Sequence, residues 1–425
     1  MIAAVVAITY QGWDLTVRGA SRPMLKGNDD VQYYFWLRSL VIDGDWDFAN
    51  DVKETPMLDS SERRELLTQP RTARGRLPDK YPLGWALASA PFFLLAHGLS
   101  LLLGWPADGW APFYQYCLWA GHLGITVAGM LVARRFLLRF LPAGAAEVGL
   151  LAGWLASPLI YYQTARISMA HGLTFSLVAF SHELAMCIRD DPARRNRWGL
   201  LGFVLSLLVV TRSTSVVYCL HPLAVLASVL RDEWRADRSA ALRLTWLAAS
   251  GFVPVGLQLW AWHQVYALWL PNTYGGEAFG FTHPALLEVL FSSWHGWFYW
   301  HPLLFPGFLA LLWCVASKRL PATWLVSTLL IIYLNSSWWC WWFGSSFGNR
   351  AFEGATLYCM AGLGFLWDSA LRSRALKFAA IVVMLAVVGN LLLLGEFMTG
   401  SISRGDSVSY TEFIRVITRL VGLST

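Results

Sequence analysis

Long runs of apolar residues, separated by short polar segments, dominate the sequence. Many of the runs are close to twenty residues of Leu, Val, Ala, Phe and Trp, which is about the length that crosses the hydrocarbon core of a membrane as a helix. The clearest runs cover residues 110–133, 144–163, 198–211 continuing to 230, 243–270 and 376–395. The pattern predicts an all-α, polytopic membrane protein with about eleven transmembrane helices.

The two ends of the chain carry weaker signals. The first apolar stretch, residues 2–10, is too short to span unless it continues through Leu15. No basic n-region or small-residue cleavage site accompanies it, so we expect no removed signal peptide. The tail from residue 396 is expected outside, as a surface-lying amphipathic helix with one apolar face that consists of Phe413, Ile414, Ile417, Leu420 and Val421.

Basic residues recur in clusters that lie two apolar runs apart. Short cytoplasmic loops of membrane proteins are enriched in Lys and Arg, so this alternation places all the clusters on the cytoplasmic side. The loops around 162–172, 211–215, 271–301 and 336–352 then face outward. The clusters are Arg134, Arg135 and Arg139; Arg189, Arg194, Arg195 and Arg197; Arg231, Arg235, Arg238 and Arg243; Lys318 and Arg319; and Arg372, Arg374 and Lys377.

One apolar stretch, residues 82–103, does not fit this alternation. If it were a span, every later basic cluster would lie outside, so we predict an interfacial helix broken at Pro91 and lying on the outer surface. Together with a helix at 31–42 it belongs to a first outer loop. The whole chain 1–425 is then one membrane-embedded domain with five parts: the first loop 13–109, core spans 110–270, a Trp-rich outer loop 271–301, C-terminal spans 302–395 and the tail 396–425.

Composition agrees with the membrane interpretation. The chain is 56% hydrophobic and 14% charged, and its mean hydropathy is +0.46. The net charge of +6 is explained by loop charges that direct orientation, so we expect no nucleic-acid partner. Neither the six cysteines nor the His and carboxylate residues fall at metal-ligand spacing, so a divalent metal is possible but not indicated.

The first candidate site is acidic. Asp29 and Asp30, with Tyr33 shortly after them, precede the helix at 31–42. Repulsion between paired carboxylates raises the pKa of one of them, which makes a general base. The alternative interpretation is structural, because Asp29 or Asp30 at this position would also cap the free amides of that helix.

Basic residues supply candidate phosphate ligands. Lys80, followed by Tyr81, stands just before a helix that begins with proline, where an ammonium and the positive end of a helix can hold a phosphate together. Arg166 and His171 occupy a turn between two spans. Arg212 interrupts more than twenty apolar residues, and a charge there costs roughly 2.5–3.5 kcal/mol at the lipid centre unless it has a partner. For Lys80, snorkelling to lipid headgroups is the structural alternative.

Two clusters of tryptophan lie in the outward loops. The first contains His295 and Trp297, and the second contains Trp342 and leads to Arg350. Indole faces bind sugar rings and cations, and the Arg350 guanidinium offers two donors to a phosphate. An interfacial aromatic belt would also be rich in tryptophan.

Residues 25–230 resemble GT-C fold glycosyltransferases, in particular the lipid A aminoarabinose transferases and the protein O-mannosyltransferases. The resemblance rests on Asp-Asp followed by a tyrosine, an Asp-Gly-Asp-Trp turn at 43–46 and Lys-Tyr-Pro-Leu-Gly at 80–84. It implies an enzyme that uses a polyprenyl-phosphate-linked sugar as donor and a lipid, glycan or protein as acceptor. Such an enzyme would be a multi-pass protein of the bacterial inner membrane with its active site on the periplasmic face.

The resemblance also implies roles for individual residues. Asp29 matches the catalytic acid of the first loop, with Asp30 beside it, and Lys80 matches a lysine that holds the donor phosphate. Arg212 and Arg166 stand where these families carry basic residues. His171 departs from the pattern, because the related proteins have an acidic residue there; this puts a shared metal or second-carboxylate role in doubt.

Two other classes of function are compatible with a polytopic protein. A flippase or transporter of lipid-linked sugars usually has inverted repeats and broken helices at the midplane, and the sequence has no visible repeat. A polysaccharide or lipid ligase would place its site in a late outer loop, where Glu277, His283, Glu288 and His295 are candidates.

Overall fold

The computed structural model describes residue 25 and residues 27–233 and 239–420. Its elements in chain order are α2 (Asn28–Arg38), η1 (Ser39–Asp43), α3 (Ala49–Glu54), α4 (Ser60–Leu67), α5 (Gly84–Leu103), α6 (Pro112–Leu137), α7 (Ala143–Leu155), η2 (Tyr161–Ala165), α8 (Ala170–Asp190), α9 (Arg195–Thr211), η3 (Ser213–Cys219), α10 (Leu220–Glu233), α11 (Ser239–Tyr266), α12 (Leu286–Phe291), α13 (Trp297–Trp300), α14 (Leu304–Ala316), α15 (Ala322–Ser337), η4 (Arg350–Phe352), α16 (Glu353–Leu371), α17 (Leu376–Thr399) and α18 (Tyr410–Leu420).

The described part of the chain is helical, as predicted. Besides helices it forms one isolated β-bridge, between Phe279 and Trp338. Five of its helices are long and apolar enough to cross a membrane, and α7, α14 and α15 are shorter apolar helices. The chain is therefore an all-α, polytopic membrane protein. The five are Gly84–Leu103, Pro112–Leu137, Ser213–Arg231, Ala240–Tyr266 and Leu376–Thr399. The first predicted span, within residues 1–24, lies outside the described residues.

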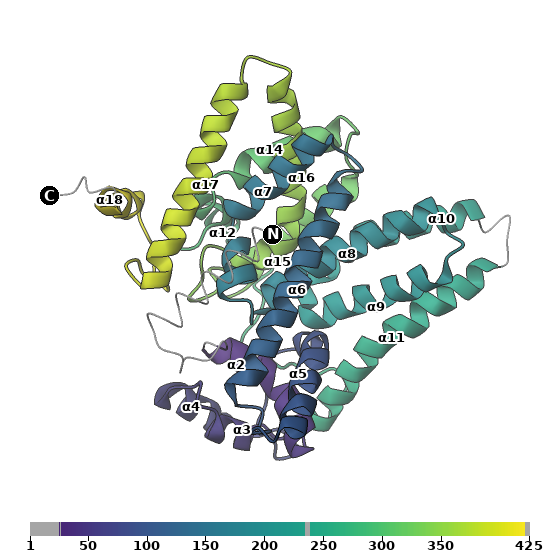
Figure 1. The fold of residues 1–425 in the computed structure, drawn as a ribbon, viewed down its shortest axis with the longest axis vertical. Coiled ribbons are helices and arrows are strands. Elements are labelled where there is room, and N and C mark those ends of the chain that lie inside the picture. The colour runs from purple at the N-terminus through teal and green to yellow at the C-terminus, as the bar shows by residue number, and fades with distance from the viewer. Residues whose placement is uncertain (1–24, 26, 234–238, 421–425) are drawn as a thin grey trace.

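The long helices pack into one bundle (Figure 1). Helix α9 lies along α11, α6 lies along α8, and α16 packs between α7 and α14. Small residues allow the closest of these contacts. A Cβ atom on Gly362 of α16 would lie 2.0 Å from the carbonyl oxygen of Gly307 in α14, so the backbones of the two helices meet directly.

Helices α2 to α5 gather at one end of the bundle (Figure 1). Arg38, at the end of α2, fixes this group because its Nη1 atom lies 2.6 Å from Asp43 and 2.8 Å from Asp51. The predicted helix at 31–42 corresponds to α2 and the π-helical turn η1. The predicted break at Pro91 is wrong: α5 runs unbroken from Gly84 to Leu103.

Helix α5 is itself long and apolar enough to span, and whether it lies on the surface stays a prediction. It packs against α2, α6 and α9, while Leu101 and Leu102 point away from the protein and are 62% and 79% exposed. An exposed apolar face of this kind is unfavourable in water and is typical of a helix that contacts lipid, whether the helix spans the bilayer or lies on its surface.

Arg212 marks the place where the chain reverses. Helix α9 ends at Thr211, and the 3-10 turn η3 leads from Ser213 into α10. The end of α10, the start of α11 and the connection between α16 and α17 all lie far from α3 and α4 in Figure 1. The predicted tail helix is present as α18, although residues 421–425 lie outside the described part.

Candidate functional site

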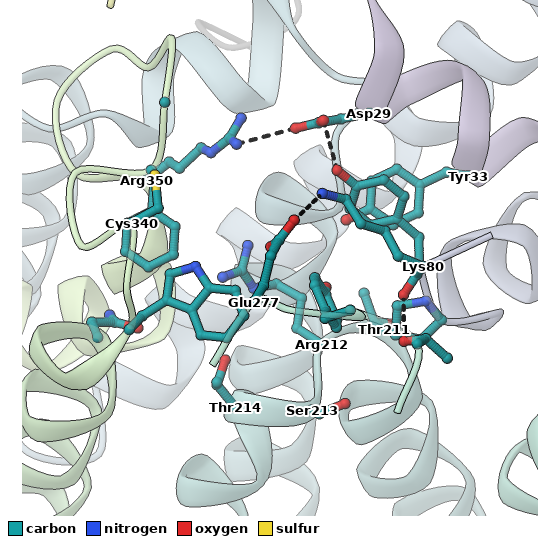
Figure 2. Close-up of a pocket in the computed structure, with 18 of the residues that line it drawn as sticks. Asp29, Tyr33, Lys80, Thr211, Arg212, Ser213, Thr214, Glu277, Cys340 and Arg350 are labelled. Carbon is teal, nitrogen blue, oxygen red and sulfur yellow. Dashed lines mark hydrogen bonds and ion pairs between the residues drawn. The ribbon is translucent and has the colours of Figure 1, made fainter. Parts of the chain in front are cut away.

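A cavity of about 430 Å³ opens where α2, the start of α5, the end of α9 and two later segments, 271–279 and 335–350, meet. Figure 2 shows charged side chains from these distant parts of the chain pointing into it. Seven of the predicted site residues line the cavity: Asp29, Tyr33, Lys80, Tyr81, His171, Arg212 and Arg350. Tertiary structure therefore collects residues that are up to 321 positions apart in sequence.

Asp29 lies at the top of the cavity in Figure 2. One of its carboxylate oxygens is 3.1 Å from Nη2 of Arg350, and the other accepts a hydrogen bond of 2.6 Å from the Tyr81 hydroxyl. Burial acts to raise the pKa of Asp29, but Arg350 and the Tyr81 hydroxyl outweigh it and leave the pKa lowered. The Asp29 carboxylate is therefore ionised at neutral pH and is ready to accept a proton.

Two sequence-based interpretations of Asp29 are corrected by this geometry. The pKa is not raised by repulsion from Asp30, because cationic and hydrogen-bonding neighbours dominate. Nor does either aspartate cap the helix: Gly27 is the N-cap residue of α2 and no side chain caps it. Asp29 and Asp30 lie inside the first turn, where the helix dipole stabilises negative charge.

Asp30 points away from the cavity and is fully buried. Its carboxylate accepts hydrogen bonds of 2.9 and 3.0 Å from Nε and Nη2 of Arg166, and one of 2.6 Å from Ser168. Arg166 is thus engaged with Asp30 and is not among the residues that line the cavity. This bidentate ion pair connects α2 to the segment between η2 and α8.

Lys80 reaches across the cavity to a residue of a much later segment. Its Nζ atom lies 2.9 Å from Glu277 (Figure 2). Its backbone carbonyl accepts a hydrogen bond of 2.9 Å from the Thr273 hydroxyl. The segment around Glu277 is held in turn against the second tryptophan cluster, since the Trp339 amide donates to the carbonyl of Ala278 at 3.2 Å.

Arg212 forms an ion pair with Glu353, which confirms the expectation that a charge within an apolar run has a partner. Its Nε atom lies 3.1 Å from Glu353, and its Nη1 atom lies 2.8 Å from Nδ1 of His171. Glu353 was missed in the sequence, because it stands at the start of an apolar run, where a charge is ordinary, whereas Arg212 interrupts one.

Close packing puts Arg212 at the cavity. A Cβ atom on Gly84 would lie 2.4 Å from the backbone nitrogen of Thr211, so the start of α5 can approach the end of α9 only because residue 84 is glycine. The glycine that ends the Lys-Tyr-Pro-Leu-Gly motif is therefore required for the close contact between α5 and α9.

Aromatic residues form one wall of the cavity, but not all of those that were predicted. The wall contains Trp262, Tyr274, Phe279, Trp338, Trp339 and Phe343. Of these, Trp338 and Trp339 belong to the second tryptophan cluster.

The predicted residues Trp297, His295 and Trp342 are not brought to this cavity. Trp297 is fully buried and stacks on Phe352 at 4.3 Å. His295 lies 3.0 Å from the carbonyl oxygen of Trp342, whose ring stacks on Trp294 at 4.0 Å. These contacts pack one loop against another, and no sequence pattern separated such aromatics from those that face the cavity.

The charges of the cavity are balanced in pairs. Lys80 faces Glu277, Arg212 faces Glu353 and Arg350 faces Asp29. An anionic group that enters therefore meets cations whose charge these carboxylates already partly neutralise. Within the described part of the chain no three His, Cys, Asp or Glu side chains are grouped so as to hold a metal ion.

The fold and the cavity together define a polytopic membrane protein with a charged, partly aromatic pocket at one end of its helical bundle. No protein-family model matches the chain. Nor does any curated protein match it in sequence.

The comparison with solved structures finds ArnT and an archaeal oligosaccharyltransferase, each at a TM-score below 0.5. ArnT from Cupriavidus metallidurans in the apo state is 15% identical, with a TM-score of 0.49, over 100% of this chain and 71% of that chain. Its complex with undecaprenyl phosphate is 16% identical, with a TM-score of 0.48, over 98% and 70% of the two chains.

The archaeal oligosaccharyltransferase AglB from Archaeoglobus fulgidus, in complex with an inhibitory peptide and a dolichol-phosphate, is 10% identical. The TM-score is 0.44 over 99% of this chain and 54% of that chain. Similarity at this level concerns the arrangement of helices and carries no information about substrate.

Proposed function

We propose that the protein is a membrane glycosyltransferase that moves a sugar from a polyprenyl-phosphate donor to an acceptor hydroxyl. The observation that carries the proposal is the convergence of Asp29 with Lys80, Arg212 and Arg350 on one cavity with an aromatic wall. Cations suit the donor phosphate, aromatic faces suit a sugar ring, and an ionised carboxylate suits a proton acceptor.

In the proposed reaction the bond between the sugar C1 atom and the phosphate oxygen breaks, and a bond between C1 and the acceptor oxygen forms. Asp29 takes the acceptor proton, and the phosphate leaves with the bonding electron pair as a polyprenyl phosphate. The cations stabilise the charge that develops on this leaving group. Lys80, Arg212 and Arg350 supply this positive charge, so we propose that no metal cofactor takes part.

We place the cavity on the outer, periplasmic face of a bacterial inner membrane. The basic ends of α10, α11, α16 and α17 lie far from α3 and α4 (Figure 1), which agrees with a cytoplasmic location for the former group. Donor and lipid acceptors would then enter from the bilayer, and glycan or protein acceptors from the aqueous side.

The test is transfer by purified protein, in detergent or liposomes, from radiolabelled polyprenyl-phosphate sugars to extracted envelope lipids, glycans and peptides. Transfer that requires Asp29 supports the proposal. Movement of intact donor across the bilayer without bond cleavage would instead identify a flippase and contradict the proposal.

The ligase alternative receives little support from the geometry. Of the four candidates in the late loop, only Glu277 lines the cavity, and it is paired with Lys80. His283, Glu288 and His295 are not among the lining residues.

A further inference from the structure

The three carboxylates that balance the cavity cations differ in how firmly they are held. The side chains of Asp29 and Glu277 line the cavity and are 30% and 28% exposed. Both are therefore accessible from the cavity. The side chain of Glu353 is only 2% exposed and is not among the lining residues, so it acts on the cavity through Arg212.

The backbone around Glu353 cannot shift easily. The preceding residue, Phe352, stacks on the buried ring of Trp297. A Cβ atom on Gly354 would lie 2.5 Å from the ring of Tyr218, and the hydroxyl of Tyr218 accepts a hydrogen bond of 3.1 Å from the amide of Ala355. These contacts fix the first turn of α16 and hence the carboxylate.

Burial of Glu353 lowers the stability of the folded protein, so a purely structural role does not explain this residue. Its Oε1 atom is 3.1 Å from Arg212, but its Oε2 atom has no hydrogen-bond partner and lies 3.6 Å from Nδ1 of His171. A buried carboxylate with an unsatisfied oxygen destabilises the folded state, and an apolar pair of similar volume often does better than a buried ion pair. A charge at such a costly site points to a functional need for it, because proteins break local rules of stability mainly at functional sites.

We propose that Glu353 is a fixed counter-charge that limits the grip of Arg212 on the lipid phosphate, so that the product can leave. The inference rests on the proposed transferase function. The donor is a phosphodiester with one negative charge, whereas the product is a monoester with a charge of about −1.5 to −2 at pH 7. The reaction thus raises the charge on the phosphate, and three uncompensated cations would hold the product more tightly than the donor.

The test compares binding of two probes, farnesyl phosphate and its methyl diester, to purified wild-type protein and Glu353→Gln. The Coulomb energy scales with ligand charge, so the variant should bind the monoester about tenfold more tightly and the diester about threefold. In turnover with a polyprenyl-phosphate sugar, kcat and KM should fall together, as expected when product release becomes slower.

A residue with a merely structural role would not give this pattern, because loosening Arg212 weakens binding of both probes. The matched control is Asp368→Asn, which removes a carboxylate from the far end of α16, where it pairs with Arg372 at 2.7 Å. This control should bind both probes as the wild type does. Glu353→Asp, which keeps the charge, should retain the wild-type ratio of the two affinities.

The double variant Arg212→Gln, Glu353→Gln removes both charges of the pair and leaves no buried charge unpaired. If Glu353 acts through Arg212, the preference for the monoester returns to the wild-type value or below. Tightening that persists in the double variant would overturn the inference, as would a folded Glu353→Gln protein that binds the monoester no better than the wild type. If the wild type binds neither probe, the proposed function itself fails.

Discussion

The first turn of α2 presents two adjacent carboxylates to two different environments. On the cavity side, Asp29 is 30% exposed and meets Arg350 and the Tyr81 hydroxyl. On the buried side, Asp30 is fully enclosed and accepts three hydrogen bonds from Arg166 and Ser168. The difference teaches that two adjacent aspartates can have opposite surroundings: Asp29 faces the cavity, where the proposed function uses it, whereas Asp30 holds α2 in place.

The largest effect should come from the cavity side. Asp29→Asn removes the proposed base while keeping the size of the side chain, so kcat should fall by about 10²–10⁴-fold. The measurement is single-turnover transfer with saturating donor, accompanied by donor binding, which should not weaken, because Asp29 no longer neutralises Arg350. Unchanged transfer by Asp29→Asn would end the assignment of Asp29 as base.

The buried side should respond in stability. Asp30→Asn removes the buried carboxylate that pairs with Arg166, and breaking a buried ion pair costs about 3–5 kcal/mol. The temperature of thermal unfolding in detergent should therefore fall strongly for Asp30→Asn and little for Asp29→Asn. Equal unfolding temperatures for the two variants would show that the two sides do not differ as described.

The positive charge of Arg350 influences the pH dependence of activity through the pKa of Asp29. The pKa of Asp29 is lowered from its ordinary value of 3.8 by Arg350 and the Tyr81 hydroxyl, so this carboxylate should stay ionised, and support activity, at every pH above that value. Arg350→Gln removes a positive neighbour, which raises the pKa of Asp29 and moves the acidic limb of the kcat/KM profile to higher pH. Loss of a charged hydrogen bond to phosphate should also raise KM by roughly 10–100-fold.

A smaller effect is expected for Lys80. Its side chain is 35% exposed and already paired with Glu277, so Lys80→Gln should raise the KM for donor only several-fold, as is usual for solvent-screened charges. Steady-state kinetics at two salt concentrations checks this, because the wild-type KM should depend more on salt than that of the variant. A large fall in kcat at saturating donor would contradict a role limited to binding.

The smallest effect should follow chelation. Because the cavity supplies cationic side chains of its own, treatment with EDTA followed by dialysis should leave transfer unchanged. Restoration of a lost activity by added Mg²⁺ or Mn²⁺ would show that the carboxylates of the cavity side also hold a metal.

The sequence was informative wherever a local rule decides structure. Apolar runs of membrane length predicted the helices, and the charge inside the run at Arg212 correctly demanded a partner. The first-loop motifs named Asp29, Lys80 and Tyr81, which all line the cavity. The break at Pro91 was predicted wrongly, because packing of α5 against α2, α6 and α9 favours a continuous helix over the local preference of proline.

Other assignments depended on contacts between distant parts of the chain. Nothing in the tryptophan-rich loops separates Trp339, which lines the cavity, from Trp297, which is buried against Phe352. Glu353 and Glu277 became part of the site only when the partners of Arg212 and Lys80 were visible.

The sequence by itself thus determined the membrane class, the positions of the helices and the residue types available for chemistry, since hydropathy and motif act over a few turns of chain. Tertiary structure alone decided which of Asp29 and Asp30 faces the cavity and which carboxylate opposes each cation. Such pairings arise because Coulomb and hydrogen-bond energies depend on distance in space, and the partners of Asp29 and Asp30 come from residues 81, 166–168 and 350.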